Sequence, residues 1–173
     1  MLRGIYSYLR GILVLFYSDQ CFQIFKLTQS WYSNSIIRKI VKSEVTGMIG
    51  KIETNSAPAA IGPYSQATVF GDLIFTSGQI PLSPETGQIV GDDIMSQTQQ
   101  VMKNIAGLLE AAGSDFSHVL KTTCFITDMA NFSGLNEVYA SYFTDNKPAR
   151  SCVAAKQLPR DVLVEIETIA IRK

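Results

Sequence analysis

The sequence predicts an α+β domain, a mixed β-sheet with two helices packed on one face. From residue 52 onward, β-prone and helical runs follow one another in the order strand, strand, helix, strand, helix, strand, strand. Both helical runs have one apolar face, which a sheet can cover. The length of 173 residues allows one such domain with a leader before it.

The predicted sheet begins with a hairpin. A loop rich in Pro and Gly, residues 57–64, leads into β-prone runs at 67–70 and 73–76. The dipeptide at 71–72, Gly-Asp, is a hairpin signal, so these two strands should be antiparallel. The second strand ends at residues 77–81, and residues at strand ends are well placed to bind ligands.

The two helices are expected on either side of a buried strand. In the first, at 94–112, apolar residues recur at three- and four-residue steps, with Asp93 as N-cap and Gly113 as stop signal. Residues 119–127 are β-branched and mostly apolar, as in a buried strand. The second helix should open at Asn131 and close shortly before the next strand.

Two final strands are expected at 150–155 and 162–171. A sheet that carries helices on one face leaves its other face to be covered by something else. Copies of the same chain can cover that face, so we expect a homo-oligomer.

The charge is unevenly distributed along the chain. Residues 1–50 carry a net charge of +4 and residues 51–173 a net charge of −4. The sequence therefore predicts an N-terminal targeting leader, 1–50, that is cleaved or disordered, and a separate domain, 51–173. A mildly acidic domain lacks the basic surface of a dedicated duplex-DNA binder, and we expect no nucleic-acid partner.

The leader has the composition of a mitochondrial transit peptide, since it is basic, rich in serine and poor in acidic residues. Its longest apolar run, residues 12–17, is too short to span a bilayer, and no small-x-small cleavage site follows it. We expect import into the mitochondrial matrix and no membrane association. Translation from Met48 would instead give a cytoplasmic form.

Few residues of the chain suit metal or thiol chemistry. His118 is the only histidine, which excludes metal sites with two or more His ligands, and it is expected to stabilise the turn before its strand. Three cysteines form no CxxC, although a bond between Cys124 and Cys152 is geometrically possible. Dinucleotide, P-loop and hydrolase-elbow motifs are absent from the sequence, so we expect neither a metal nor a cofactor.

Arg150 is the first candidate for a binding residue. It opens a strand directly after Pro148-Ala149, and its planar guanidinium can bind a carboxylate through two parallel bonds. The alternative is a surface salt bridge. Cys152 shares its strand face, but no base lies nearby in the sequence, so its backbone is expected to matter more than its thiol.

Glu165 and Glu167 lie two residues apart on one strand, so both should point to the same face. The flanking residues are apolar, and at least one carboxylate should therefore be partly buried or lie between subunits. Paired glutamates can act in hydrolysis, but an interface ion pair beside a solvated acid would produce the same pattern.

Four separated motifs occur along the domain, namely APAAIGPYSQA at 57–67, FTSGQIP at 75–81, PARSCV at 148–153 and VEIE at 164–167. In this order they closely resemble the RidA (YjgF) family of 2-iminobutanoate/2-iminopropanoate deaminases. The resemblance covers residues 52–173, and the leader makes the whole similar to a fungal mitochondrial-type member.

The resemblance implies a chorismate-mutase-like fold and a homotrimer, a trimeric barrel with three sites in clefts between subunits. It makes Arg150 the carboxylate-binding residue and Glu165 the acid that holds the attacking water and the departing ammonia. Tyr64 and Ser77 match cleft residues, while Gly78 and Cys152 match positions whose backbone lines the site. The stretch before Pro148 is shorter than in many members, which implies an altered pocket rim.

The implied reaction is hydrolysis of C–N bonds in 2-aminoacrylate, 2-aminocrotonate or their imines, giving 2-oxo acids and ammonia without metal or cofactor. Such enamines come from pyridoxal-phosphate dehydratases. The implied role is to remove them, which protects pyridoxal-phosphate enzymes and supports branched-chain amino acid metabolism, including isoleucine biosynthesis. Three alternatives remain: a non-catalytic regulator that binds small carboxylates, a ribonuclease or translation inhibitor, and a chorismate-mutase-type isomerase.

Overall fold

The computed structural model describes residues 6–9, 12–15 and 49–173. Two units are distinguished along the chain, residues 1–46 and residues 47–173. Within the first, strands β1 (Tyr6–Leu9) and β2 (Ile12–Leu15) pair antiparallel. Apart from residues 49 and 50, the rest of the predicted leader lies outside the described residues. Among the residues that are described, no helix is both long and apolar enough to cross a bilayer.

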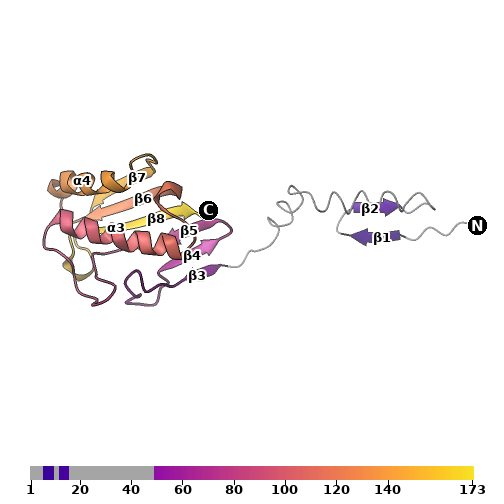
Figure 1. The fold of residues 1–173 in the computed structure, drawn as a ribbon, viewed down its shortest axis with the longest axis horizontal. Coiled ribbons are helices and arrows are strands. Elements are labelled where there is room, and N and C mark those ends of the chain that lie inside the picture. The colour runs from indigo at the N-terminus through magenta and orange to yellow at the C-terminus, as the bar shows by residue number, and fades with distance from the viewer. Residues whose placement is uncertain (1–5, 10–11, 16–48) are drawn as a thin grey trace, which may run out of the picture. The chain divides into compact units, whose positions relative to one another are not determined.

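The second unit contains a six-stranded mixed sheet (Figure 1). Its strands are β3 (Gly50–Ile52), β4 (Ala67–Phe70), β5 (Leu73–Thr76), β6 (Val119–Ile126), β7 (Ala149–Ala154) and β8 (Val164–Ile171). Their order across the sheet is β3-β4-β5-β8-β6-β7. Only β6 and β7 are parallel, because the chain between them crosses over through a helix.

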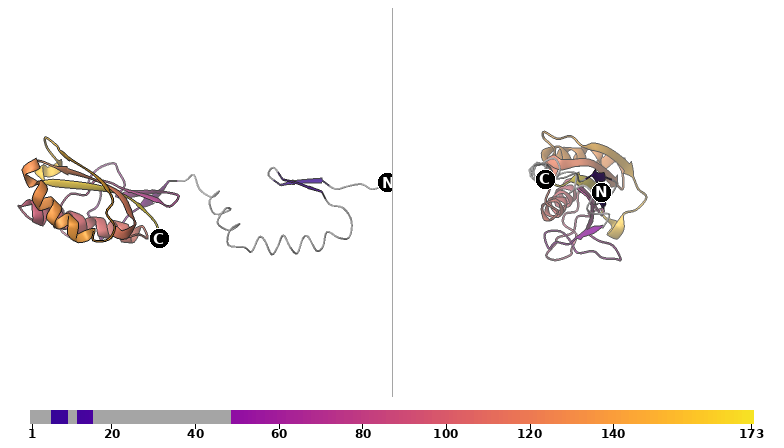
Figure 2. Two further views of the ribbon diagram at one scale, coloured as in Figure 1. Left: turned by 90° about the horizontal axis from the view of Figure 1, so that it is seen from above. Right: turned by 90° about the vertical axis from the view of Figure 1, so that its right-hand side faces the viewer.

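Two helices, α3 (Ile94–Ala111) and α4 (Phe132–Tyr142), lie on the same side of the sheet (Figure 2). The Asp93 carboxylate caps α3 by accepting hydrogen bonds from the N–H groups of Met95 and Ser96. Gly113 follows the helix with a φ of 77°, which favours glycine. These observations confirm the predicted fold class, both helices and their position on one face.

The main core lies between this sheet face and the helices. Alternate residues of each central strand point into it, as Ile166 of β8 does, whereas Glu165 and Glu167 point to the open face. The largest fully buried side chains of this core are Ile74, Met102, Ile105, Leu109, Ile126, Leu135 and Ile166. A second, smaller cluster of buried side chains consists of Ile80, Leu82, Leu158 and Val162.

Two details differ from the sequence-based prediction. Strand β3 was not predicted, because three residues are too few to show a period, and it begins at Gly50, one residue before the expected start of the domain. Asn131 precedes α4 but makes no side-chain capping bond. Instead, Asp128 caps the short 3-10 helix Met129–Asn131, which runs directly into α4.

Candidate functional site

A surface pocket of about 300 Å³ lies where the loop before β4, the end of β5 and the start of β8 meet. It brings together four of the predicted site residues, from positions up to about a hundred residues apart in sequence: Tyr64, Ser77, Gly78 and Glu165. Apolar side chains complete the lining, namely Ile61, Ile80 and Pro159. The lining of the pocket thus includes one carboxylate and two hydroxyl-bearing residues, Ser77 and Tyr64, beside these apolar side chains.

Gly78 makes room for the carboxylate of Glu165. A Cβ atom at position 78 would lie 1.8 Å from Glu165 Oε1 and 2.7 Å from its Cδ. The backbone around Gly78 is held against β8, because Gln79 and Ile166 exchange backbone hydrogen bonds of 2.9 and 3.0 Å. Any side chain at position 78 would therefore displace the Glu165 carboxylate from its place.

Glu165 is half-buried, and its neighbour Glu167 on the same face is exposed. Burial raises the pKa of Glu165, and repulsion from the Glu167 carboxylate raises it further. A carboxyl group whose pKa is closer to 7 can both accept and return a proton near neutral pH. Among the described residues, no salt bridge holds either glutamate.

Ser77 is fixed by the loop that carries Tyr64. Its hydroxyl donates a 2.7 Å hydrogen bond to the Ser65 carbonyl, and its N–H donates a 3.0 Å bond to the Gln66 carbonyl. The exposed Tyr64 ring turns back on its own loop, where its hydroxyl accepts a bond from the Ile61 N–H. The lip of the pocket is therefore connected to the end of β5.

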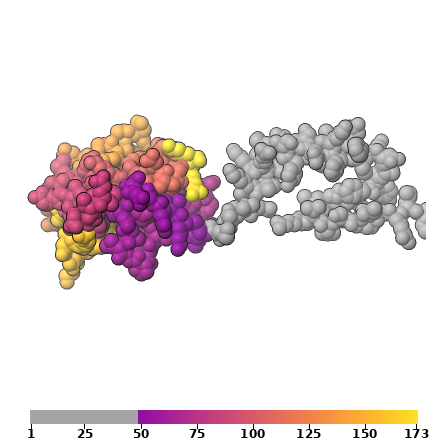
Figure 3. Space-filling view, turned by 60° about the horizontal axis from the view of Figure 1, so that its bottom comes forward, coloured from indigo at the N-terminus to yellow at the C-terminus, as the bar shows by residue number. Residues whose placement is uncertain are grey.

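Gln66 anchors this loop and was missed in the sequence. The side-chain oxygen of this buried residue accepts a bond from the Thr54 N–H, and its amide nitrogen donates to the carbonyls of Thr54, Ala57 and Pro58. The segment it organises lies at the surface of the domain, in the purple part of Figure 3. Gln66 lies within the motif at 57–67, but that motif does not tell its role, which only the tertiary contacts show.

Arg150 and Cys152 lie elsewhere, on the edge strand β7. Cys152 is opposite Cys124, and Cys124 is opposite Ile166, whose side chain points into the core. Arg150 shares the face of Cys152 and therefore lies on the helix-covered side of the sheet. Glu165 lies on the open side, so a single chain does not bring Arg150 and Glu165 together.

The two neighbouring cysteines are free thiols. Burial raises the pKa of Cys124 to about 12, and the pKa of Cys152 is also raised by burial, against a lowering effect of the Arg150 charge. Neither thiol has the lowered pKa of an activated nucleophile. The role predicted for the backbone of Cys152 stays a prediction.

His118 is remote from the pocket and belongs to the turn before β6, as predicted. Its Nδ1 lies 2.8 Å from the Asp115 carboxylate, which also binds Lys173. These partners hold the pKa of Asp115 well below its usual range. Within residues 49–173 and the two short strands, no group of three potential metal-binding side chains occurs.

The fold and the pocket define a class of small α+β proteins that have a one-sided mixed sheet and a surface pocket at the ends of two of its central strands. Residues 54–172 match the family model described as Endoribonuclease L-PSP. The chain belongs to this family, which is also called the RidA (YjgF) family. The 2-iminobutanoate/2-iminopropanoate deaminase of Escherichia coli K12 is 45% identical over 125 residues, covering 70% of this chain and 97% of that protein.

Further relatives agree with this assignment. Reactive Intermediate Deaminase A, chloroplastic, of Arabidopsis thaliana is 45% identical over 138 residues, which are 80% of this chain and 71% of that protein. The crystal structure of the Thermotoga maritima protein TM0215 superposes with a TM-score of 0.71 at 51% identity, covering 73% of this chain and 99% of that one. These similarities confirm the YjgF-type, chorismate-mutase-like fold.

Proposed function

We propose that this protein hydrolyses 2-imino acids, formed from enamines such as 2-aminoacrylate and 2-aminocrotonate, to 2-oxo acids and ammonia. The observation that supports this proposal most strongly is the half-buried Glu165 carboxylate, which lies over Gly78 in a pocket that Ser77 and Tyr64 also line. Deaminase names among relatives that are 45% identical support the same reaction class.

The chemistry needs positioning and proton transfer only. Protonation of the enamine at carbon gives an iminium, and Glu165 orients a water molecule and accepts one of its protons as the water oxygen bonds to the imine carbon. Glu165 passes that proton to the amine nitrogen, the C–N bond breaks as ammonia leaves, and the hydroxyl group loses its remaining proton to give the 2-oxo acid. The substrate is already electrophilic, so its orientation supplies much of the rate enhancement.

The substrate carboxylate requires a cation, and the pocket of one chain has none among its lining residues. Arg150 is the candidate, but it lies on the opposite face of the sheet from Glu165. A second copy of the chain would supply the missing arginine and also cover the apolar residues of the open face. We therefore propose a homotrimer with each site between two subunits, in which Cys152 contributes backbone groups.

The leader supports a proposed location in the mitochondrial matrix, with Met48 as an alternative start for a cytoplasmic form. A chloroplastic relative carries an organelle in its name, although that name applies to the plant protein. The proposed working partners are pyridoxal-phosphate dehydratases that release enamines from serine and threonine. Residues 1–50 would be the targeting segment and residues 51–173 the deaminase domain.

The decisive experiment measures the release of ammonia and 2-oxo acid from enamine that a dehydratase generates continuously in the same cuvette. The wild-type chain should accelerate release beyond the spontaneous rate. Arg150→Lys keeps the charge but loses the two parallel hydrogen bonds to the carboxylate. The resulting fall in kcat/KM should correspond to a loss of about 2 to 4 kcal/mol of transition-state stabilisation. Cys152→Ala should stay substantially active because only its backbone is used.

The alternatives give different outcomes in this assay. A regulator that only binds carboxylates would bind 2-oxobutanoate without accelerating release, and an RNA-cleaving protein would do neither. An inactive Cys152→Ala beside a fully active Arg150→Lys would replace the proposed mechanism with thiolate chemistry.

A further inference from the structure

The guanidinium of Arg150 lies against aromatic rings of α4. Its Cζ atom is 4.6 Å from the centre of the Tyr139 ring and 5.6 Å from the centre of the Phe132 ring. Both distances are within the range in which a ring face attracts a cation. The rings come from the helix that links β6 to β7, and Arg150 stands near the start of β7.

The Tyr139 ring is itself held in place. Its hydroxyl shares a 2.8 Å hydrogen bond with the hydroxyl of Thr122, which is opposite Arg150 in the ladder between β6 and β7. The ring of Phe143 packs on it, with the two ring centres 4.5 Å apart. Tyr139 and Thr122 are both buried, so the ring that Arg150 contacts is part of the core.

Ring contact leaves the hydrogen-bonding edge of the guanidinium available. An aromatic ring interacts with a guanidinium through its face, whereas a carboxylate binds two N–H groups in the guanidinium plane. Arg150 is exposed, and no acidic side chain within the described residues forms a salt bridge with it. The side chain is therefore oriented by rings while its charge stays free for a ligand.

We propose that Tyr139 and Phe132 are positioning residues, which hold the Arg150 guanidinium in the orientation that binds the carboxylate of the ligand. This inference rests on the proposed function and adds to it the origin of carboxylate affinity. Ordering a free arginine upon binding costs conformational entropy, and a side chain that is already oriented avoids part of that cost. A flexible lysine would gain less from the rings, which is a second reason for arginine at this position.

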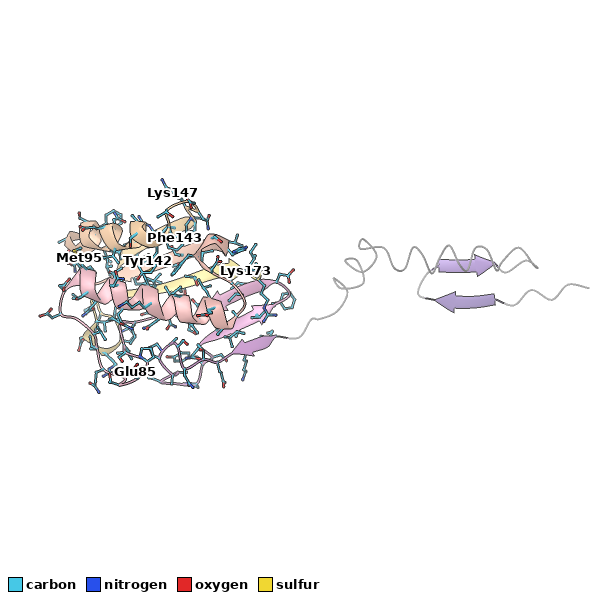
Figure 4. All side chains as sticks on the ribbon, in the orientation of Figure 1. Glu85, Met95, Tyr142, Phe143, Lys147 and Lys173 are labelled. Carbon is cyan, nitrogen blue, oxygen red and sulfur yellow. The ribbon has the colours of Figure 1, made fainter. Side chains whose placement is uncertain are left out.

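The test compares three variants of the full chain. Tyr139→Leu removes the ring, Tyr139→Phe keeps the ring without the hydroxyl, and Tyr142→Leu is the matched control. Tyr142 is the last residue of α4, labelled in Figure 4, and its hydroxyl binds Gln99 rather than Thr122. Two readouts are needed: KM and kcat for enamine hydrolysis, and the calorimetric Kd of 2-oxobutanoate, a stable 2-oxo acid.

Tyr139→Leu should raise KM and the Kd of 2-oxobutanoate about five- to tenfold, with kcat changed less than twofold. Tyr139→Phe should restore most of the affinity, and Tyr142→Leu should bind like wild type. In the Arg150→Lys background, Tyr139→Leu should have little further effect, because the ring acts through the guanidinium. If Tyr139→Leu does not fold, Phe132→Leu replaces it, with a smaller expected rise in Kd.

A folded Tyr139→Leu variant with wild-type Kd overturns the positioning role, and so does an effect of the same size in Arg150→Lys. Loss confined to kcat also overturns it. If the variants change the Kd of 2-oxobutanoate as expected but the wild-type chain releases no ammonia, only the deaminase proposal is overturned. A wild-type chain that binds no 2-oxobutanoate would contradict the positioning role as well.

Discussion

The helix-covered face of the sheet differs from the open face in whether its side chains find packing and hydrogen-bond partners within the same chain. On the covered face, Ile74 and Val164 are fully buried, and the hydroxyls of Thr76 and Thr168 lie 3.2 Å apart. On the open face, Phe75 is 39% exposed on β5, one strand away from the unpaired Glu165 on β8. The covered face is complete within one chain, whereas the open face has both apolar area and charge that lack partners among the described residues.

The two faces also carry different candidate site residues. Arg150 belongs to the covered side, at its edge, and Glu165 belongs to the open side. A sheet one backbone thick keeps the two side chains apart, so the proposed hydrolysis requires a second copy of the chain. The following predictions test that division.

Glu165→Gln should have the largest effect on activity. Turnover should fall about a hundredfold or more, because the amide cannot accept a proton from water. The measurement is kcat in the dehydratase-coupled assay, with Glu167→Gln as the control at an exposed acid on the same face. Comparable losses in both variants would contradict the assignment of Glu165 as the reacting carboxylate.

The same substitution should raise Tm. Because burial raises the folded-state pKa of Glu165, its contribution to stability is complete below the unfolded pKa and is lost as pH rises through the folded pKa. The Tm advantage of Glu165→Gln should therefore grow from acidic to neutral pH. An advantage that disappears at neutral pH would mean that a cation from another copy already neutralises Glu165.

Mixing two inactive variants should restore activity. Arg150→Lys and Glu165→Gln chains, unfolded together and refolded in equal amounts, should regain about a quarter of wild-type activity if each site takes one residue from each of two copies. Sedimentation should show three subunits throughout. Refolding each variant alone is the control, and a mixture no more active than its components would place both residues of a site in one chain.

Gly78→Ala should lower kcat/KM about tenfold without unfolding the domain, because the new methyl group displaces the end of the flexible Glu165 side chain. Circular dichroism and the coupled assay give the two readouts. Gly50→Ala is the matched control, since a Cβ there meets only Val69 atoms at ordinary distances of 3.7 Å or more. An unchanged kcat/KM in Gly78→Ala would show that the position of the carboxylate is not critical.

Glu167→Gln should have the smallest effect, a shift in pH dependence. Removing the second charge lowers the pKa of Glu165, although burial is the larger cause of its elevation. The acid limb of the kcat/KM profile should therefore move to lower pH, by less than about one unit. Glu110→Gln, an exposed acid of α3, should leave the profile unchanged. A shift to higher pH would contradict the proposed repulsion.

The sequence by itself determined most of the secondary structure and the type of sheet. The hairpin at 67–76 and the helix between Asp93 and Gly113 follow from local rules, because turn chemistry, capping and hydrophobic period act over a few residues. The shared face of Glu165 and Glu167 follows from the two-residue repeat of a strand. Family membership was also readable, since four motifs occur in the same order as in the family.

Only the tertiary structure decided which of these residues meet. The place of β8 between β5 and β6 puts Glu165 beside Gly78, and the parallel pairing of β6 with β7 puts Arg150 on the other face. The anchoring role of Gln66 and the rings around Arg150 likewise depend on contacts between distant segments. Such contacts are set by strand order and register over the whole sheet, which no local pattern of residues encodes.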